Sequence, residues 1–124
     1  MLSGMTRRLV VKVTAGADAP ERCAQAFTVA ATAASTNVPV SLWLTGESTW
    51  FALPGRAETF ELAHAPRLDA LLEAVLVGGR VTVCSQCAAR REITEADVLP
   101  GISIAGAASF LHEVMAEGTQ ALVY

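Results

Sequence analysis

The stretch Val81-Thr82-Val83-Cys84-Ser85-Gln86-Cys87-Ala88-Ala89-Arg90-Arg91 carries the pattern that decides the fold. A short run rich in β-branched residues ends on a cysteine, and a helix-forming run with two arginines follows at once. The pattern predicts a buried strand that delivers Cys84 to the N-terminus of a helix. The dipole and the unpaired N–H groups at such an end favour a thiolate and bring a cysteine pKa below about 8.5. We therefore expect Cys84 to be a nucleophile or a sulfur carrier.

Strand and helix patterns alternate on both sides of this stretch. We expect strands at residues 8–14, 38–44, 80–84, 102–104 and 120–124. Helices are expected after Asp18, from Pro66 to the glycines at 78 and 79, after Cys84, and at 107–117. Short connections between alternating strands and helices are typical of a mostly parallel sheet with helices on both faces, a three-layer α/β sandwich.

Two boundary residues carry specific expectations. Asp18 is a candidate N-cap for the first helix, with Glu21 as its capping-box partner. Pro39 predicts either an edge position for the second strand or the beginning of that strand.

Length and composition restrict the class of protein. The 124 residues suit one domain, at 8–124, after a flexible tail at 1–7. A net charge of -3 without a basic patch argues against nucleic-acid binding. No apolar run is long enough to span a bilayer or to act as a signal peptide. Three cysteines without a signal segment favour a reducing cytoplasm, and a hydrophobic fraction of 52% suggests subunit contacts.

Three loops are expected at the carboxyl edge of the sheet, where open α/β sheets bind ligands. They hold Gly16 to Asp18, Gly46 to Ser48, and Cys84 to Cys87. None of them matches a nucleotide-binding motif, so no nucleotide cofactor is expected.

The cysteines allow several interpretations. Cys84 is either a reactive thiol or a small apolar residue that ends a core strand. Cys87 forms a Cys-x-x-Cys motif with Cys84 and is either a resolving thiol or an inward-packing helix residue. Cys23 lies on the inner stripe of the first helix and is expected in the core. One cysteine pair without histidines at ligand spacing does not predict a metal site.

Three charged residues are candidates to support the cysteine. Arg91 lies on roughly the same helical face as Cys84, about 10 Å further along, and can extend toward an anion or a partner's acid. Arg90 points elsewhere, and adjacent arginines are usually solvent-exposed. Glu47 either orients a donor or is an ordinary surface acid.

The segment from Val83 to Arg91 resembles the DsrE/DsrF-like family, which includes the TusD-type sulfur-relay proteins. In that family a strand ends on the reactive cysteine, a short Ala-rich helix follows, and a basic pair comes six to eight residues later. Cys84 matches the cysteine, and Arg90 and Arg91 match the basic pair, whereas Glu92 stands where the family has glycine. The tail that begins at residues 101–107 is also similar to the family's closing strand, turn, helix and final strand.

The resemblance implies a flavodoxin-like fold with five parallel strands, assembled as homo-trimers or hexamers. It also implies a cytoplasmic sulfur carrier or sulfurtransferase, in which Cys84 holds sulfane sulfur as a persulfide and passes it from a donor protein to an acceptor protein. Two alternatives remain open. One is a non-catalytic oligomeric binding module, and the other is a thiol–disulfide redox protein that uses Cys84 and Cys87.

Overall fold

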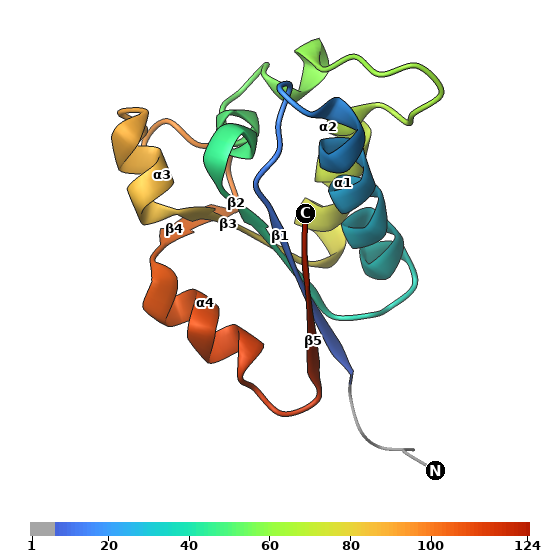
Figure 1. Cartoon of the computed structure of the whole chain (residues 1–124), viewed down its shortest axis with the longest axis vertical. Helices are drawn as coiled ribbons and strands as arrows, with labels where there is room; N and C mark the ends of the chain where they lie inside the picture. The colour runs from blue at the N-terminus through green and yellow to red at the C-terminus, as the bar shows by residue number, and fades with distance from the viewer. Residues whose placement is uncertain (1–6) are drawn as a thin grey trace.

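The computed structural model describes residues 7–124, so the predicted tail at 1–7 lies outside the described residues except for Arg7. Five strands and four α-helices follow one another, with two short 3-10 helices in one connection (Figure 1). In chain order they are β1 (Arg8–Val13), α1 (Pro20–Ser35), β2 (Val40–Leu44), η1 (Gly46–Ala52), η2 (Ala57–Thr59), α2 (Leu68–Gly78), β3 (Arg80–Cys84), α3 (Ser85–Arg90), β4 (Ile102–Ala105), α4 (Ala107–Val114) and β5 (Thr119–Val123).

The strands form one all-parallel sheet in the order β4-β3-β2-β1-β5. The chain advances from β1 to β4 in one direction and then returns to the far side of β1 for β5. Because parallel crossovers are right-handed, this reversal puts α1 and α2 on one face of the sheet and α4 on the other. Figure 1 shows α1 and α2 together on one side of the strands, α4 on the opposite side, and α3 above the strand ends. The predicted three-layer α/β sandwich is confirmed.

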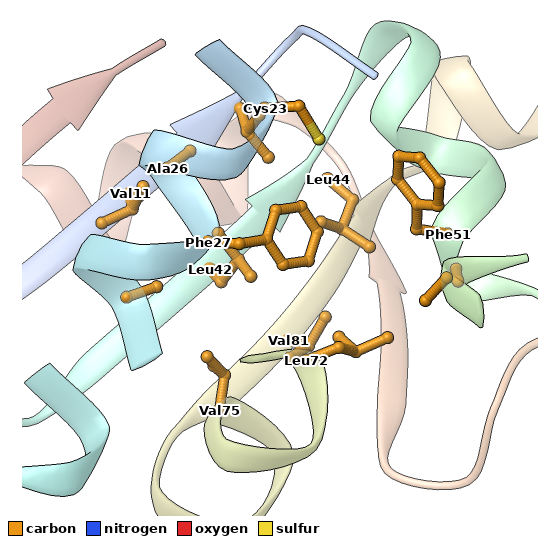
Figure 2. Close-up of a cluster of buried hydrophobic side chains, with 14 of the residues drawn as sticks. Val11, Cys23, Ala26, Phe27, Leu42, Leu44, Phe51, Leu72, Val75 and Val81 are labelled. Atoms are coloured by element: carbon orange, nitrogen blue, oxygen red, sulfur yellow. The ribbon is translucent and has the colours of Figure 1, made fainter. Parts of the chain in front are cut away.

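The main core lies between the sheet and the α1–α2 layer. Alternate residues of the central strands point into it, and the alanine-rich face of α1 lets Phe27 reach the centre, where no part of its side chain is exposed. Figure 2 shows Phe27 surrounded by side chains from the strands, α2 and η1. Its ring meets the Phe51 ring edge to face, with 6.1 Å between centroids. The labelled members of this cluster are Val11, Cys23, Ala26, Phe27, Leu42, Leu44, Phe51, Leu72, Val75 and Val81.

The opposite face of the sheet is more polar. Lys12, Trp43 and Thr82 are register partners on neighbouring strands and therefore form one row on the α4 side. The Trp43 ring packs edge to face against Phe110 of α4, and its indole N–H donates to a carboxylate oxygen of Glu113 at 3.1 Å. No residue of α4 is itself buried, so this helix covers the sheet without being enclosed.

The two boundary predictions have different outcomes. The prediction of Asp18 as N-cap is wrong, because α1 begins at Pro20 with Ala19 as an N-cap that has no side-chain hydrogen bond. The Asp18 carboxylate instead accepts a hydrogen bond from the Gly16 N–H at 2.8 Å. It therefore stabilises the loop and not the first turn of α1. Pro39 does precede the first residue of β2, but the edge alternative is wrong, because β2 lies between β1 and β3. A proline just outside the ladder removes no donor from it.

Replacement of Phe27 by alanine tests the core. We expect Phe27→Ala to lower the free energy of unfolding by about 3–5 kcal/mol, because a large buried ring leaves a cavity. Val77→Ala is the control, since Val77 is 79% exposed on α2 and should change stability by no more than about 0.5 kcal/mol. Urea unfolding measures both, and a Phe27→Ala loss below about 1 kcal/mol would contradict this packing.

Candidate functional site

Cys84 occupies the point where β3 ends and two helices begin. It is the N-cap residue of α3, and in the parallel register it lies beside Ala105, the last residue of β4. Gly106 follows as the N-cap of α4, and a Cβ added there would lie 3.2 Å from Ser85 Oγ. The N-termini of α3 and α4 therefore both begin next to Cys84. The partial positive charge of helix N-termini stabilises a nearby anion.

Cys87 lies in the first turn of α3, buried behind Cys84. The Gly46 N–H donates to its sulfur at 3.3 Å, which ties α3 to the loop that follows β2. Gly46 can form this loop because its φ of 53° is left-handed, and a Cβ there would lie 2.6 Å from the Thr14 carbonyl oxygen. The three cysteines are free thiols.

The environment of Cys84 favours its thiolate. Partial burial alone raises the pKa of Cys84, but four groups lower it by more. They are the backbone N–H of Cys87, the Cys87 thiol, the backbone N–H of Gln86 and the positive charge of Lys12. The net effect is that the pKa of Cys84 lies below its ordinary value. The sequence pattern did not indicate Lys12, although one lysine in an otherwise apolar stretch of strand is a signal that could have found it.

Arg91 and Glu47 meet at this edge. The Arg91 guanidinium donates to Glu47 Oε2 at 2.8 Å and to the Cys87 carbonyl oxygen at 3.1 Å. It also lies 5.7 Å from the centroid of the Trp50 ring. Arg90 is exposed and forms no ion pair within residues 7–124. The structure therefore brings Arg91 and Glu47 to the cysteine motif and leaves Arg90 apart.

Gly16 is the contact point between the first and second loops. A Cβ added at Gly16 would lie 2.7 Å from the carbonyl carbon and oxygen of Glu47. The Glu47 N–H in turn donates to the Thr14 carbonyl oxygen at 3.2 Å. The absence of a side chain at Gly16 thus lets the Glu47 backbone approach β1. The loops after β1, β2 and β3 meet at the edge where the sequence predicted them.

Comparison with protein-family models gives one match over almost the whole chain. The model described as the DsrE/DsrF-like family matches residues 7–124. The chain belongs to the DsrE/DsrF-like family. The resemblance inferred from the Cys84 segment is therefore confirmed.

Solved structures from several organisms have the same fold. The YchN protein of E. coli superposes with a TM-score of 0.78 at 16% identity, covering 97% of this chain and 100% of that chain. MTH1491 of Methanobacterium thermoautotrophicum, a protein of unknown function, gives 0.70 at 12% identity, covering 95% and 99%. BT1422 of Bacteroides thetaiotaomicron, a conserved protein of unknown function, gives 0.61 at 11% identity, covering 94% of each chain. A search of curated proteins finds no match.

Other parts of this DsrE-like chain do not offer a second reactive site within residues 7–124. Cys23 is fully buried, and burial together with the nearby Asp18 raises its pKa to about 12, so it stays a thiol at neutral pH. Residues 7–124 contain no group of three or more histidine, cysteine or acidic side chains placed to hold a metal ion. Within the same residues, no helix is both long and apolar enough to cross a membrane. Cavities of 680 and 330 Å³ are lined by residues other than Cys84 and Cys87.

Gly16→Ala tests the contact between the loops. The added methyl group would overlap the Glu47 backbone, so we expect a loss of about 1–3 kcal/mol in the free energy of unfolding. The displaced loop should also weaken the Glu47–Arg91 pair. Urea unfolding of the purified variant measures the loss, and a variant as stable as the parent protein would mean that the loops do not approach so closely.

Cys87→Ala tests the contribution of the Cys87 thiol to the lowered pKa of Cys84. Loss of the thiol donor should raise the pKa of Cys84 and slow its alkylation by iodoacetamide about threefold to tenfold at neutral pH. Cys87→Ser keeps a donor and should alkylate at nearly the parent rate. Cys23→Ser is the control and should change nothing. Equal rates in Cys87→Ala and the parent protein would show that Cys87 does not stabilise the thiolate.

Proposed function

We propose that this DsrE-like protein is a cytoplasmic sulfur carrier that holds sulfane sulfur as a persulfide on Cys84 and passes it to a partner protein. The observation that carries the proposal is the environment of Cys84. Cys84 is partly exposed at the end of β3, and two backbone N–H groups, the Cys87 thiol and Lys12 favour the negative charge of its thiolate. A persulfide anion bonded to the same sulfur needs the same stabilisation.

The transfer requires no cofactor and no net oxidation. The Cys84 thiolate attacks the outer sulfur of a donor persulfide, a new S–S bond forms and the donor's S–S bond breaks. The donor leaves as a thiolate and takes up the proton that its persulfide carried. In the second step an acceptor thiolate attacks the outer sulfur on Cys84, and Cys84 leaves as the thiolate that the site stabilises.

A protein partner suits the shape of this edge. Cys84 lies where strand ends and helix starts meet, and it lines neither the 680 Å³ nor the 330 Å³ cavity. The Glu47–Arg91 pair is partly exposed beside it and offers both signs of charge to a docking surface. A donor or acceptor thiol on a protruding segment of a partner protein could therefore reach Cys84. A small molecule would not be enclosed there.

We also propose that the chain assembles as a homo-oligomer, a trimer or a hexamer. Large apolar side chains are exposed on α4 and on the edge strand β5. Leu111 of α4 is 60% exposed, Met115 at the C-cap of α4 is 74% exposed, and Val123 of β5 is 65% exposed. Exposed apolar surface is a common feature of protein interfaces.

One alternative has a specific observation in its favour. The Cys87 thiol is one of the groups that lower the pKa of Cys84, and it lies three residues along in the first turn of α3, where a resolving thiol would lie. After deprotonation it would attack the inner sulfur of the persulfide, form a Cys84–Cys87 disulfide and release HS⁻. The protein would then belong to the thiol–disulfide class. A non-catalytic module is the remaining alternative.

The intact mass of the reduced protein after exposure to a sulfane-sulfur donor tests the proposal. We expect a gain of one sulfur atom in the parent protein and in Cys23→Ser, and no gain in Cys84→Ser. The Cys87→Ser variant should retain the added sulfur at least as long as the parent protein.

The other outcomes separate the alternatives. Loss of two hydrogens without a gain of sulfur would move the protein to the thiol–disulfide class. No mass change in any variant would contradict the carrier proposal and favour the binding module.

A further inference from the structure

Lys12 lies on the same face of the sheet as Cys84. Lys12 pairs in register with Trp43, and Trp43 with Thr82, so the three side chains form a row on the α4 side. Cys84 follows Thr82 by two residues and therefore points to the same side, one row nearer the carboxyl edge. From strand spacing and rise, the Cα atoms of Lys12 and Cys84 are about 12 Å apart. The four-carbon stem of lysine spans roughly half of that distance.

The ammonium group of Lys12 is held by an aromatic ring rather than by an acid. Its nitrogen lies 5.3 Å from the centroid of the Phe110 ring, near the start of α4. The Phe110 ring is fixed in turn by its edge-to-face contact with Trp43. A half-buried cation over a ring face is attracted by the ring but is not neutralised by it. The ring thus keeps the charge at a defined place on this face.

No carboxylate of residues 7–124 forms an ion pair with Lys12. Two acids on the surrounding elements hydrogen-bond to groups other than Lys12, and Glu113 keeps its negative charge because its partner is neutral. Glu113 of α4 accepts the Trp43 N–H, and Glu47 pairs with Arg91 beyond α3. A partly desolvated cation without an acidic partner gains most from an anion formed nearby. Besides the Glu113 carboxylate, the thiolate of Cys84 is the anion that this face can form.

We infer that Lys12 is a positioning residue for the sulfur of Cys84, and that its ammonium group, held on Phe110, is the counter-charge of the thiolate and of the persulfide anion. The part that concerns the persulfide rests on the proposed function, whereas the part that concerns the thiolate does not. When a donor adds sulfur to Cys84, the negative charge moves outward by one atom. Because Coulomb attraction falls only gradually with distance, the ammonium group on Phe110 still acts on the charge in its new position.

The rate of alkylation of Cys84 against pH tests the inference, with the modified cysteine identified by peptide mass mapping. In Lys12→Gln we expect the midpoint of the profile to rise by about half to one pH unit, which makes alkylation about three to ten times slower below the midpoint. Lys12→Arg should restore most of the parent profile, since it keeps the charge. Arg8→Gln is the control, because Arg8 lies on the same strand and face but at the opposite end of the sheet.

Two results would overturn the inference. One is an unchanged midpoint in Lys12→Gln. The other is an equal shift in Lys12→Arg, which would mean that the lysine stem rather than its charge matters. If Lys12→Gln does not fold, Phe110→Leu provides the test, because it leaves Lys12 in place and removes the ring. We expect a smaller upward shift in Phe110→Leu, and an unchanged midpoint there would contradict the role of the ring.

The sulfur-transfer proposal can fail independently. Alkylation requires no sulfur donor, so a Lys12-dependent midpoint in a protein that gains no sulfur would support the electrostatic role and contradict the carrier. If Cys84 gains sulfur but the midpoint of its alkylation profile is the same in Lys12→Gln as in the parent protein, the result would support the carrier proposal and contradict the role of Lys12.

Discussion

The in-register parallel pairing of β1, β2 and β3 is the constraint on which the rest of the structure depends. Parallel strands with no register offset end at one edge, so the segments that follow them must meet there. Buried hydroxyl groups then join the loop after β2 to the end of β1. Thr45 Oγ1 and Ser48 Oγ both donate to the Val13 carbonyl oxygen, at 2.9 and 2.8 Å. With the first two loops fixed in this way, the Gly46 N–H is in place for the sulfur of Cys87.

The same fold gives two cysteines opposite chemistry. Cys23 is enclosed by the apolar layer between α1 and the sheet, where burial and the nearby Asp18 keep it protonated. Cys84 is only partly buried, and the groups that surround it compensate for the loss of water with N–H donors and one cation. The difference arises because the N-terminus of a helix leaves its first backbone N–H groups unpaired, whereas a helix interior uses its donors within itself.

The two faces of the sheet differ in polarity and in how they are covered. The face under α1 and α2 is apolar and holds the main core, with Phe27 at its centre (Figure 2). The face under α4 carries Lys12, Trp43 and Thr82, and its covering helix buries none of its own residues. Stability therefore comes mainly from one layer, and the other layer is free to carry charge toward the site. The reversal of the chain between β4 and β5 makes this division possible, because it sends α4 alone to the second face.

The sequence by itself determined the order of strands and helices, the parallel sheet, and the position of Cys84 between β3 and α3. These features follow from local periodicity and from residues that begin or end helices. Short segments of the sequence are therefore enough to predict them. The prediction of Asp18 as a helix N-cap was wrong, because a carboxylate can either cap a helix or close a loop. Only the surrounding backbone selects between these two roles. The sequence left Pro39 ambiguous for the same reason, since strand order is not a local property.

Only the tertiary structure decided which side chains share the site. Arg91 joins Glu47 while the adjacent Arg90 does not, and Gly16 matters because the Glu47 backbone passes over it. Lys12 is 72 residues from Cys84 along the chain, and no motif links them. They lie on the same face because β1 and β3 both pair with β2. Register and crossover direction set such distances through space, and these are long-range properties that the spacing of residues in a sequence does not encode.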